Sequence, residues 1–318
     1  MNNSLDNSVK IAIVGVGNVG ATFAYALLGS GLVSQIVLID YNKKRAEGEA
    51  MDLNHAVPLT HSTRIWAGDY PDCAGAAITV ITAGTGQKPG ENRLALVQRN
   101  YEIFQGIIPQ IVKYNPDGLL LIASNPLDVL SYAAMKLSGL PSSHVIGSGT
   151  ILDTARFRYL LSQHAGVDPR SVHAFIIGEH GDSEVPVWSS ANIAGMALAD
   201  YCKINCEEYD AGVYEKIFEQ TRDAAYQIIE RKGATFYGIG MGLVRICEAI
   251  LRGQHTVLSV STLIHDYYGI DDVYLSLPCI VNRDGVEKFL RLPLNETEIA
   301  GLQKSSKVLK ETIKSLGL

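Results

Sequence analysis

The feature that most constrains this chain is a cluster of three glycines directly after a short apolar run. Residues 10–14 (KIAIV) have the composition of a buried strand, and residues 15–20 (GVGNVG) follow without a gap. Residues 21–28 then have the composition of a helix. A strand, a G-x-G-x-x-G turn and a helix in this order are typical of the start of a dinucleotide-binding βαβ unit.

Each position of the glycine turn has a physical role in such a unit. Gly15 permits the tight turn, Gly17 lets a pyrophosphate approach the backbone, and Gly20 lets the helix pack closely on the strand. Asn18 and Val19 lie at the start of the helix, where free N–H groups and the helix dipole attract phosphate. We therefore expect these residues to bind a dinucleotide.

An acidic residue gives the second signal for the cofactor. Asp40 ends the next apolar run and lies 20 residues beyond Gly20. A carboxylate at this place accepts hydrogen bonds from the adenosine ribose and repels a 2′-phosphate. The sequence thus predicts NAD in preference to NADP, although an aspartate also ends many strands that bind nothing.

Apolar runs alternate with helical patterns through the rest of the first half. We expect further strands at residues 35–40, 77–82, 119–123 and from 144, and helices at 93–114 and 127–137. Buried strands that alternate with helices form a parallel sheet covered on both faces. The predicted fold class is α/β, with a doubly wound parallel sheet (Rossmann) in a dinucleotide-binding domain of residues 1–149.

The second half has a different pattern. We expect helices at residues 151–164, 207–231, 235–252 and 296–316, and strands at 171–177, 273–281 and 285–292. The last two strands flank the turn at residues 282–285 (NRDG), which indicates an antiparallel pair. We therefore expect an α+β substrate domain over residues 150–318.

Composition excludes several classes of protein. The formal net charge is -6 with no run of Lys and Arg, which argues against a nucleic-acid partner. No apolar stretch is long enough to span a membrane, and the polar residues 1–10 do not resemble a signal peptide, so we expect a cytoplasmic protein. Cys202 and Cys206 form a C-x3-C pair with no second pair nearby, and we interpret them as incidental thiols and expect no metal.

Three distant segments carry reactive side chains. A glycine-rich loop at residues 84–93 holds Gln87 and Arg93, which are placed to reach a ligand if the loop closes. Asp153 and Arg156 are three apart on a predicted helix and share a face, and His180 lies between glycines just past a strand. Taken singly, these features are also consistent with a solvated arginine, a surface ion pair and an inert histidine.

Together with the glycine turn, these segments resemble the L-lactate dehydrogenase family. The similar motifs run from Lys10 through the last helix. They are GVGNVG, LID, TAG with GQKPGENR, SNPLD, LDTARF, IIGEHGDSEVPVW and KGATFYGIG.

The resemblance implies a catalytic role for four residues. His180 is the acid–base, which suits a side chain whose pKa lies near neutrality, and Asp153 holds its ring and favours the charged form. Arg156 binds the substrate carboxylate through two parallel hydrogen bonds, and Arg93 polarises the substrate carbonyl.

The resemblance also implies the lining of the substrate and nicotinamide pockets. Asn125 orients the carbonyl and the cofactor, or alternatively caps the helix that follows Pro126. Thr235 and Ile239 line the two pockets.

The same resemblance points to L-lactate and pyruvate as substrates. Malate dehydrogenases usually place an arginine where Gln87 stands, and a neutral residue there leaves a second substrate carboxylate unpaired. Malate dehydrogenase and a broader L-2-hydroxy acid dehydrogenase stay as alternatives, since Gly86 leaves room for larger substrates. A non-enzymatic NAD-binding sensor would not need the catalytic residues, and nothing in the sequence favours a protein of assembly alone.

Two further residues suggest regulation. In many bacterial members of the family, an arginine and a histidine at the positions of Arg158 and His173 bind fructose 1,6-bisphosphate across a subunit interface. The resemblance thus implies a homotetramer with this effector, and the alternative is a solvated arginine and an incidental histidine.

Overall fold

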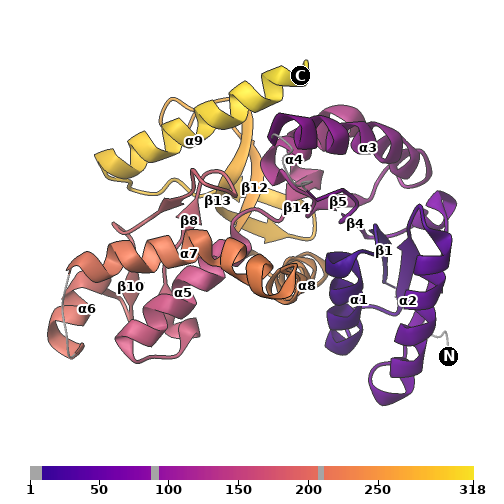
Figure 1. Ribbon diagram of the computed structural model, residues 1–318, viewed down its shortest axis with the longest axis horizontal. Coiled ribbons are helices and arrows are strands. Elements are labelled where there is room, and N and C mark those ends of the chain that lie inside the picture. Colours follow the sequence, from indigo (N-terminus) through magenta and orange to yellow (C-terminus); the bar gives the residue numbers. More distant parts are fainter. Residues whose placement is uncertain (1–8, 87–92, 207–210) are drawn as a thin grey trace, which may run out of the picture.

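A nine-stranded sheet runs through the molecule in the order β14-β13-β12-β6-β5-β4-β1-β2-β3 (Figure 1). The computed structural model describes residues 9–86, 93–206 and 211–318. Strands β1 to β6 are parallel, as the sequence predicts. They are β1 (Lys10–Val14), β2 (Gln35–Ile39), β3 (Arg64–Ala67), β4 (Ile78–Ile81), β5 (Leu119–Ile122) and β6 (Val145–Gly147).

Helices cover both faces of the parallel part because its strands are apolar on both sides. In β1, Ile11 and Ile13 belong to the core beneath α1 and α2, while Ala12 and Val14 belong to the core beneath α3 and α4. The four helices are α1 (Asn18–Ser30), α2 (Lys43–Ala56), α3 (Arg93–Tyr114) and α4 (Leu127–Ser138). The predicted doubly wound parallel sheet is confirmed, with β3 as a strand that the prediction omitted.

The second half adds helices and antiparallel strands. Its helices are α5 (Ile151–Ala165), α6 (Leu198–Asn205), α7 (Ala211–Lys232), α8 (Tyr237–Arg252) and α9 (Glu296–Ser315). Its long strands are β12 (Thr256–Ile264), β13 (Val273–Asn282) and β14 (Gly285–Phe289). These three strands extend the parallel sheet, since Ser261 of β12 pairs with Gly147 of β6. The expected α+β character is confirmed, but β12 was not predicted.

One predicted strand is wrong. Residues 171–177 form two short strands, β7 (Val172–His173) and β8 (Ile176–Ile177), which belong to different small sheets. β7 pairs with β10 (Asn192–Ile193), which also pairs with β11 (Met196–Ala197), and β8 pairs with β9 (Val185–Pro186). Where the chain passes from one small sheet to the other it is bonded to α5, since the Thr154 hydroxyl accepts the Ile176 N–H at 3.1 Å.

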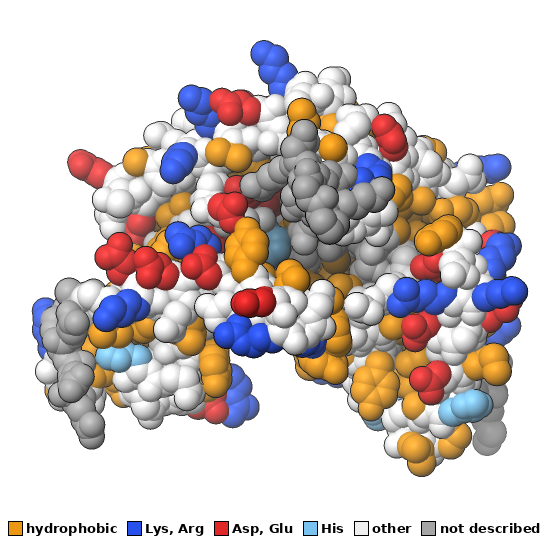
Figure 2. Space-filling view, in the orientation of Figure 1, with side chains coloured by type: hydrophobic (Ala, Val, Ile, Leu, Met, Phe, Trp, Pro, Cys, Tyr) orange, Lys and Arg blue, Asp and Glu red, His pale blue; other side chains and the backbone are white. Residues whose placement is uncertain are grey.

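The surface carries charges of both signs. On the face in Figure 2, Lys and Arg side chains are interspersed with Asp and Glu side chains. Among the described helices, none is long and apolar enough to cross a membrane.

Candidate active site

The glycine turn has the geometry of a phosphate-binding loop. Gly15 has a φ of 96° and its N–H donates to the Ile39 carbonyl oxygen at 2.7 Å, so the turn is tied to the end of β2. A Cβ at Gly20 would lie 2.1 Å from the Gly15 carbonyl oxygen, whereas a Cβ at Gly17 would meet nothing within 4 Å. The turn is thus closely packed at Gly20 and open to solvent or a ligand at Gly17. The first turn of α1, with Asn18 and Val19, begins directly after Gly17.

Asp40 lies beside this loop in a cavity of about 750 Å³. Its carboxylate accepts the Val16 N–H at 2.8 Å and the Asn42 N–H at 2.9 Å, one on each oxygen. These two bonds fix the carboxylate at the cavity and leave further acceptor capacity for ribose hydroxyls. The cavity, the open side of Gly17 and the placed carboxylate fit an adenine dinucleotide such as NAD.

The three catalytic candidates of the second half meet at the start of α5. His180 Nδ1 lies 2.5 Å from Asp153 Oδ2, and Arg156 Nη1 donates to Asp153 Oδ1 at 2.9 Å. The Asp153 side chain is only 4% exposed, while the His180 ring is 27% exposed. One buried carboxylate therefore orients both an imidazole and a guanidinium. Among the described residues, the other ring nitrogen of His180 has no hydrogen-bond partner and stays available to a ligand.

A second buried carboxylate supports His180 from the opposite half of the chain. Asp128, in the first turn of α4, accepts the His180 backbone N–H at 2.8 Å and the Ser261 hydroxyl at 2.6 Å. Burial raises the pKa of Asp128 to about 6, although both hydrogen bonds lower it. Asp128 is the last residue of the SNPLD motif, and no role for it follows from the sequence, because only the tertiary contact with His180 reveals one.

Glu184 is another residue that sequence analysis missed. It is 7% exposed, and its Oε1 has no hydrogen-bond partner within the described part of the chain. Burial and the nearby Asp153 charge raise its pKa to about 8. Its position two residues before Pro186 gives no local signal of this environment.

These carboxylates set the proton affinity of His180. Burial of the ring lowers its pKa, but the charges of Asp153, Asp128 and Glu184 outweigh that effect and raise the pKa to about 9. In turn His180 and Arg156 outweigh the burial of Asp153 and lower the pKa of that carboxyl. The pair is therefore imidazolium and carboxylate at neutral pH, ready to donate a proton.

The loop of residues 84–93 is only partly visible. Gln87 lies outside the described residues, and of Arg93 only the backbone, at the start of α3, is described. The near end of the loop is held by Asn100, whose Oδ1 accepts the Thr85 N–H at 2.8 Å and whose Nδ2 donates to the Asn125 carbonyl oxygen at 2.8 Å.

Asn125 does not cap α4. The N-cap residue is Pro126, and no side chain caps that helix end. The Asn125 side chain is exposed beside the loop, and its bond to Pro126 is cis. The alternative that Asn125 serves as a helix cap is therefore wrong.

The remaining candidates are placed as follows. Thr235 lies half-buried just before α8, and Ile239, in the first turn of that helix, packs against the main core. Arg158 donates to the Ala174 carbonyl oxygen at 2.9 Å and lines a separate cavity of about 470 Å³. His173 is exposed in β7.

A glycine turn beside a cavity, a carboxylate placed to meet a ribose and an imidazole–carboxylate–guanidinium cluster are the features of an NAD-dependent dehydrogenase of small hydroxy acids. Comparison with known families agrees. Residues 9–147 match the NAD-binding domain of the lactate/malate dehydrogenases, and residues 150–316 match the alpha/beta C-terminal domain of the same enzymes. The chain belongs to the lactate/malate dehydrogenase family, and the predicted NAD cofactor is confirmed.

Individual relatives are similar over nearly the whole chain. The L-lactate dehydrogenase of Acetivibrio thermocellus is 53% identical over 97% of this chain and 98% of its own. The probable L-lactate dehydrogenase of Schizosaccharomyces pombe is also 53% identical, over 98% of this chain and 94% of its own.

Solved structures give the same result. A lactate dehydrogenase from a deep-sea metagenome library of the Medee basin superposes with a TM-score of 0.95 at 47% identity, over 98% of this chain and 99% of that one. The minor L-lactate dehydrogenase of Enterococcus mundtii, in a ligand-bound form, gives a TM-score of 0.94 at 40% identity, over 97% and 98%.

Proposed function

We propose that this chain is an NAD-dependent L-lactate dehydrogenase that interconverts L-lactate and pyruvate. The observation that carries the proposal is that one buried carboxylate, that of Asp153, holds both His180 and Arg156. A 2-hydroxy acid offers a hydroxyl to His180 and a carboxylate to Arg156. NAD, when bound, supplies the hydride acceptor.

His180 moves the proton in both directions. In lactate oxidation the neutral ring takes the hydroxyl proton on the nitrogen opposite Asp153, and in pyruvate reduction the charged ring returns it. Asp153 fixes the ring orientation by its bond to Nδ1, and Asp128 fixes the backbone of the same residue. The raised pKa of about 9 keeps the ring charged at neutral pH, which favours pyruvate reduction.

Arg156 binds the substrate carboxylate. Its side chain is 13% exposed and uses Nη1 for Asp153, so the rest of its planar fork is free for a second carboxylate. Arg93 polarises the substrate carbonyl, Asn125 orients it together with the cofactor, and Thr235 and Ile239 line the pockets. These roles come from the family resemblance and are part of the proposal.

Gln87 favours pyruvate over oxaloacetate, because a neutral side chain leaves a second substrate carboxylate unpaired. A malate or broader L-2-hydroxy acid dehydrogenase is the competing proposal. The test measures NADH consumption with pyruvate, oxaloacetate, 2-oxoisocaproate and phenylpyruvate, with His180→Ala as the inactive control. A higher kcat/KM for oxaloacetate than for pyruvate would reject L-lactate dehydrogenase, and absence of turnover with all four would reject an enzyme.

We further propose where this chain acts, how it assembles, how it is divided into domains and which effector it binds. The chain acts in the cytoplasm as a homotetramer, and its two functional units are residues 1–149 and 150–318. Arg158 and His173 bind fructose 1,6-bisphosphate at a subunit interface. Support comes from the exposure of His173 and from the cavity lined by Arg158, Arg170 and Arg245, whose charges suit phosphate.

The test of the effector site compares pyruvate saturation with and without fructose 1,6-bisphosphate. We expect a lower KM in the wild type and no response in the double variant Arg158→Gln, His173→Gln. An unchanged KM, thermal stability and subunit assembly in the wild type would reject the effector site.

A further inference from the structure

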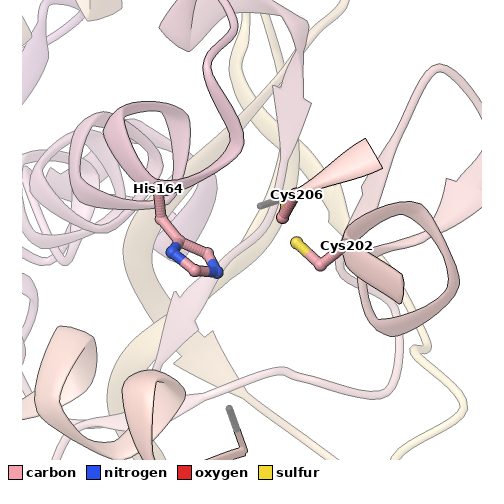
Figure 3. Close-up of side chains that lie close together, drawn as sticks. All are labelled: His164, Cys202 and Cys206. Atoms are coloured by element: carbon pink, nitrogen blue, oxygen red, sulfur yellow. The ribbon is translucent and has the colours of Figure 1, made fainter. Parts of the chain in front are cut away.

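Three metal-binding side chains meet at a place remote from the catalytic cluster. His164 lies in the last turn of α5, Cys202 lies in α6, and Cys206 follows the end of α6. Their ligand atoms all lie within 4.8 Å of one another. Figure 3 shows the His164 ring and the Cys202 sulfur facing the space beside Cys206. The C-x3-C pair thus has a third ligand that is 38 residues away in the sequence.

The local backbone holds the two thiols on one side of the helix end. The Cys206 N–H donates to the Cys202 carbonyl oxygen at 3.0 Å, so the two residues are one helical turn apart. Both are free thiols rather than a disulfide. Because Cys206 terminates the helix, its side chain can adjust more than a residue inside the helix.

The three side chains differ in their exposure to solvent. Cys202 is fully buried in the core that α5 and α6 share, while His164 and Cys206 are half-buried. The ring of His164 packs edge-on against Tyr214 with centroids 6.3 Å apart. Among the described residues, no group hydrogen-bonds to a ring nitrogen of His164, so the imidazole has a nitrogen to offer.

We propose that His164, Cys202 and Cys206 form a binding site for a thiophilic divalent cation of the zinc type, with water as the fourth ligand. Two sulfurs and one imidazole nitrogen are the donors that Zn²⁺ prefers in a tetrahedral shell. At Zn–S near 2.3 Å and Zn–N near 2.0 Å, such donors lie about 3.5–3.8 Å apart. Since the three atoms already lie within 4.8 Å of one another, they need to approach by at most about 1 Å, a shift within the reach of side-chain rotation.

Charge balance also favours a divalent ion. Binding converts two thiols to thiolates and releases two protons, so the site with a +2 ion and neutral imidazole has no net charge. We thus propose a metal-binding pair where the sequence predicted two incidental thiols and no metal.

The position of the site indicates a structural effect. α5 carries Asp153 in its first turn and His164 in its last, about 16 Å from Asp153 along the helix at 1.5 Å per residue. An ion would fasten the far end of α5 to α6 without touching the reacting groups. Binding should therefore raise the thermal stability of the chain, by an amount that grows with the logarithm of the free ion concentration once that concentration exceeds Kd.

The experiment uses Co²⁺ as a spectroscopic probe of the reduced, chelator-treated full-length protein. We expect one Co²⁺ per chain, with the thiolate-to-cobalt charge-transfer band and the intense visible bands of a tetrahedral complex, and displacement by one equivalent of Zn²⁺. Cys206→Ser should abolish most of the charge-transfer band, and His164→Gln should weaken Co²⁺ binding at least tenfold. His55→Gln, which removes an exposed imidazole on α2, is the matched control and should bind as the wild type does.

A second measurement needs no variant. Zn²⁺ should protect Cys206 from alkylation and raise Tm in the wild type. Absence of a thiolate-to-cobalt band, equal binding by Cys206→Ser and the wild type, or unprotected alkylation of Cys206 under saturating Zn²⁺ would each overturn the proposal. A Cys202–Cys206 disulfide that forms in place of metal binding would also overturn it.

Discussion

Replacing Asp153 by asparagine should change the pH dependence of turnover as well as its rate. The side chain keeps its shape but loses the charge nearest to His180 Nδ1. The pKa of His180 is raised from 6.5 to about 9, so the surroundings of the ring favour its charged form. Asp153 is the largest of the groups that raise it, and burial, which lowers it, remains in the variant.

We therefore expect the pKa of His180 to fall in Asp153→Asn, from about 9 toward its ordinary value of 6.5. Pyruvate reduction needs the charged ring, so its kcat/KM should decline at a lower pH, with a loss of about tenfold near pH 8 from protonation alone. Lactate oxidation needs the neutral ring, so the midpoint of its pH profile should also move to lower pH. At a fixed pH between the two pKa values, the variant then has less charged ring for pyruvate reduction and more neutral ring for lactate oxidation. These opposite changes separate a change of proton affinity from a general loss of activity.

The assay is kcat/KM for each direction across pH, with the cofactor saturating. The control is Asp168→Asn, which removes an exposed carboxylate that pairs with Arg170. Its profile should match that of the wild type. If the Asp153→Asn profiles have the same apparent pKa as the wild type, the electrostatic role of Asp153 is refuted even if the rate falls.

Three further predictions test the rest of the site. Gly20→Ala places a Cβ 2.1 Å from the Gly15 carbonyl oxygen, so NADH affinity and Tm should both fall. Gly29→Ala, in open space on the same helix, should instead raise the free energy of unfolding by about 0.5–1 kcal/mol. Fluorescence titration with NADH measures the affinity, and thermal melts measure the stability of both variants. Arg156→Lys keeps the charge but loses the planar fork, so the KM for pyruvate should rise by the equivalent of about 2–5 kcal/mol, and an unchanged KM would remove Arg156 from the carboxylate site. Gln87→Arg should raise kcat/KM for oxaloacetate relative to pyruvate in a substrate competition, because the new charge pairs with the second carboxylate; an unaltered ratio would contradict the role of Gln87.

Five of the six parallel strands could be predicted because they are short apolar runs, whereas β3, which begins with Arg64, was omitted. β12 was not predicted, since Ser259, Ser261 and Thr262 interrupt its apolar residues and the segment is not a continuous apolar run. These hydroxyl groups are buried because β13 and β6 flank the strand, and that information lies elsewhere in the chain. Local pattern alone has no access to such pairing.

The same reason limits prediction of the site. Asp153 and Arg156 share a helix face, so their pairing followed from helical spacing. Asp128 stands 52 residues from His180, and a carboxylate in a helix's first turn looks like an ordinary partner of the helix dipole. Its hydrogen bond with the His180 backbone N–H exists only after α4 and the segment beyond β8 have come together.

The pairing of β6 with β12 has a consequence for the modularity of the chain. β6 is flanked by β5 on one side and by a strand of the second half on the other. A fragment that ended at residue 149 would expose this buried strand as an open edge, and such edges recruit other chains. The cofactor-binding half therefore cannot be moved between enzymes by a single cut at residue 149 without opening its sheet, because the strand that covers β6 lies more than a hundred residues downstream.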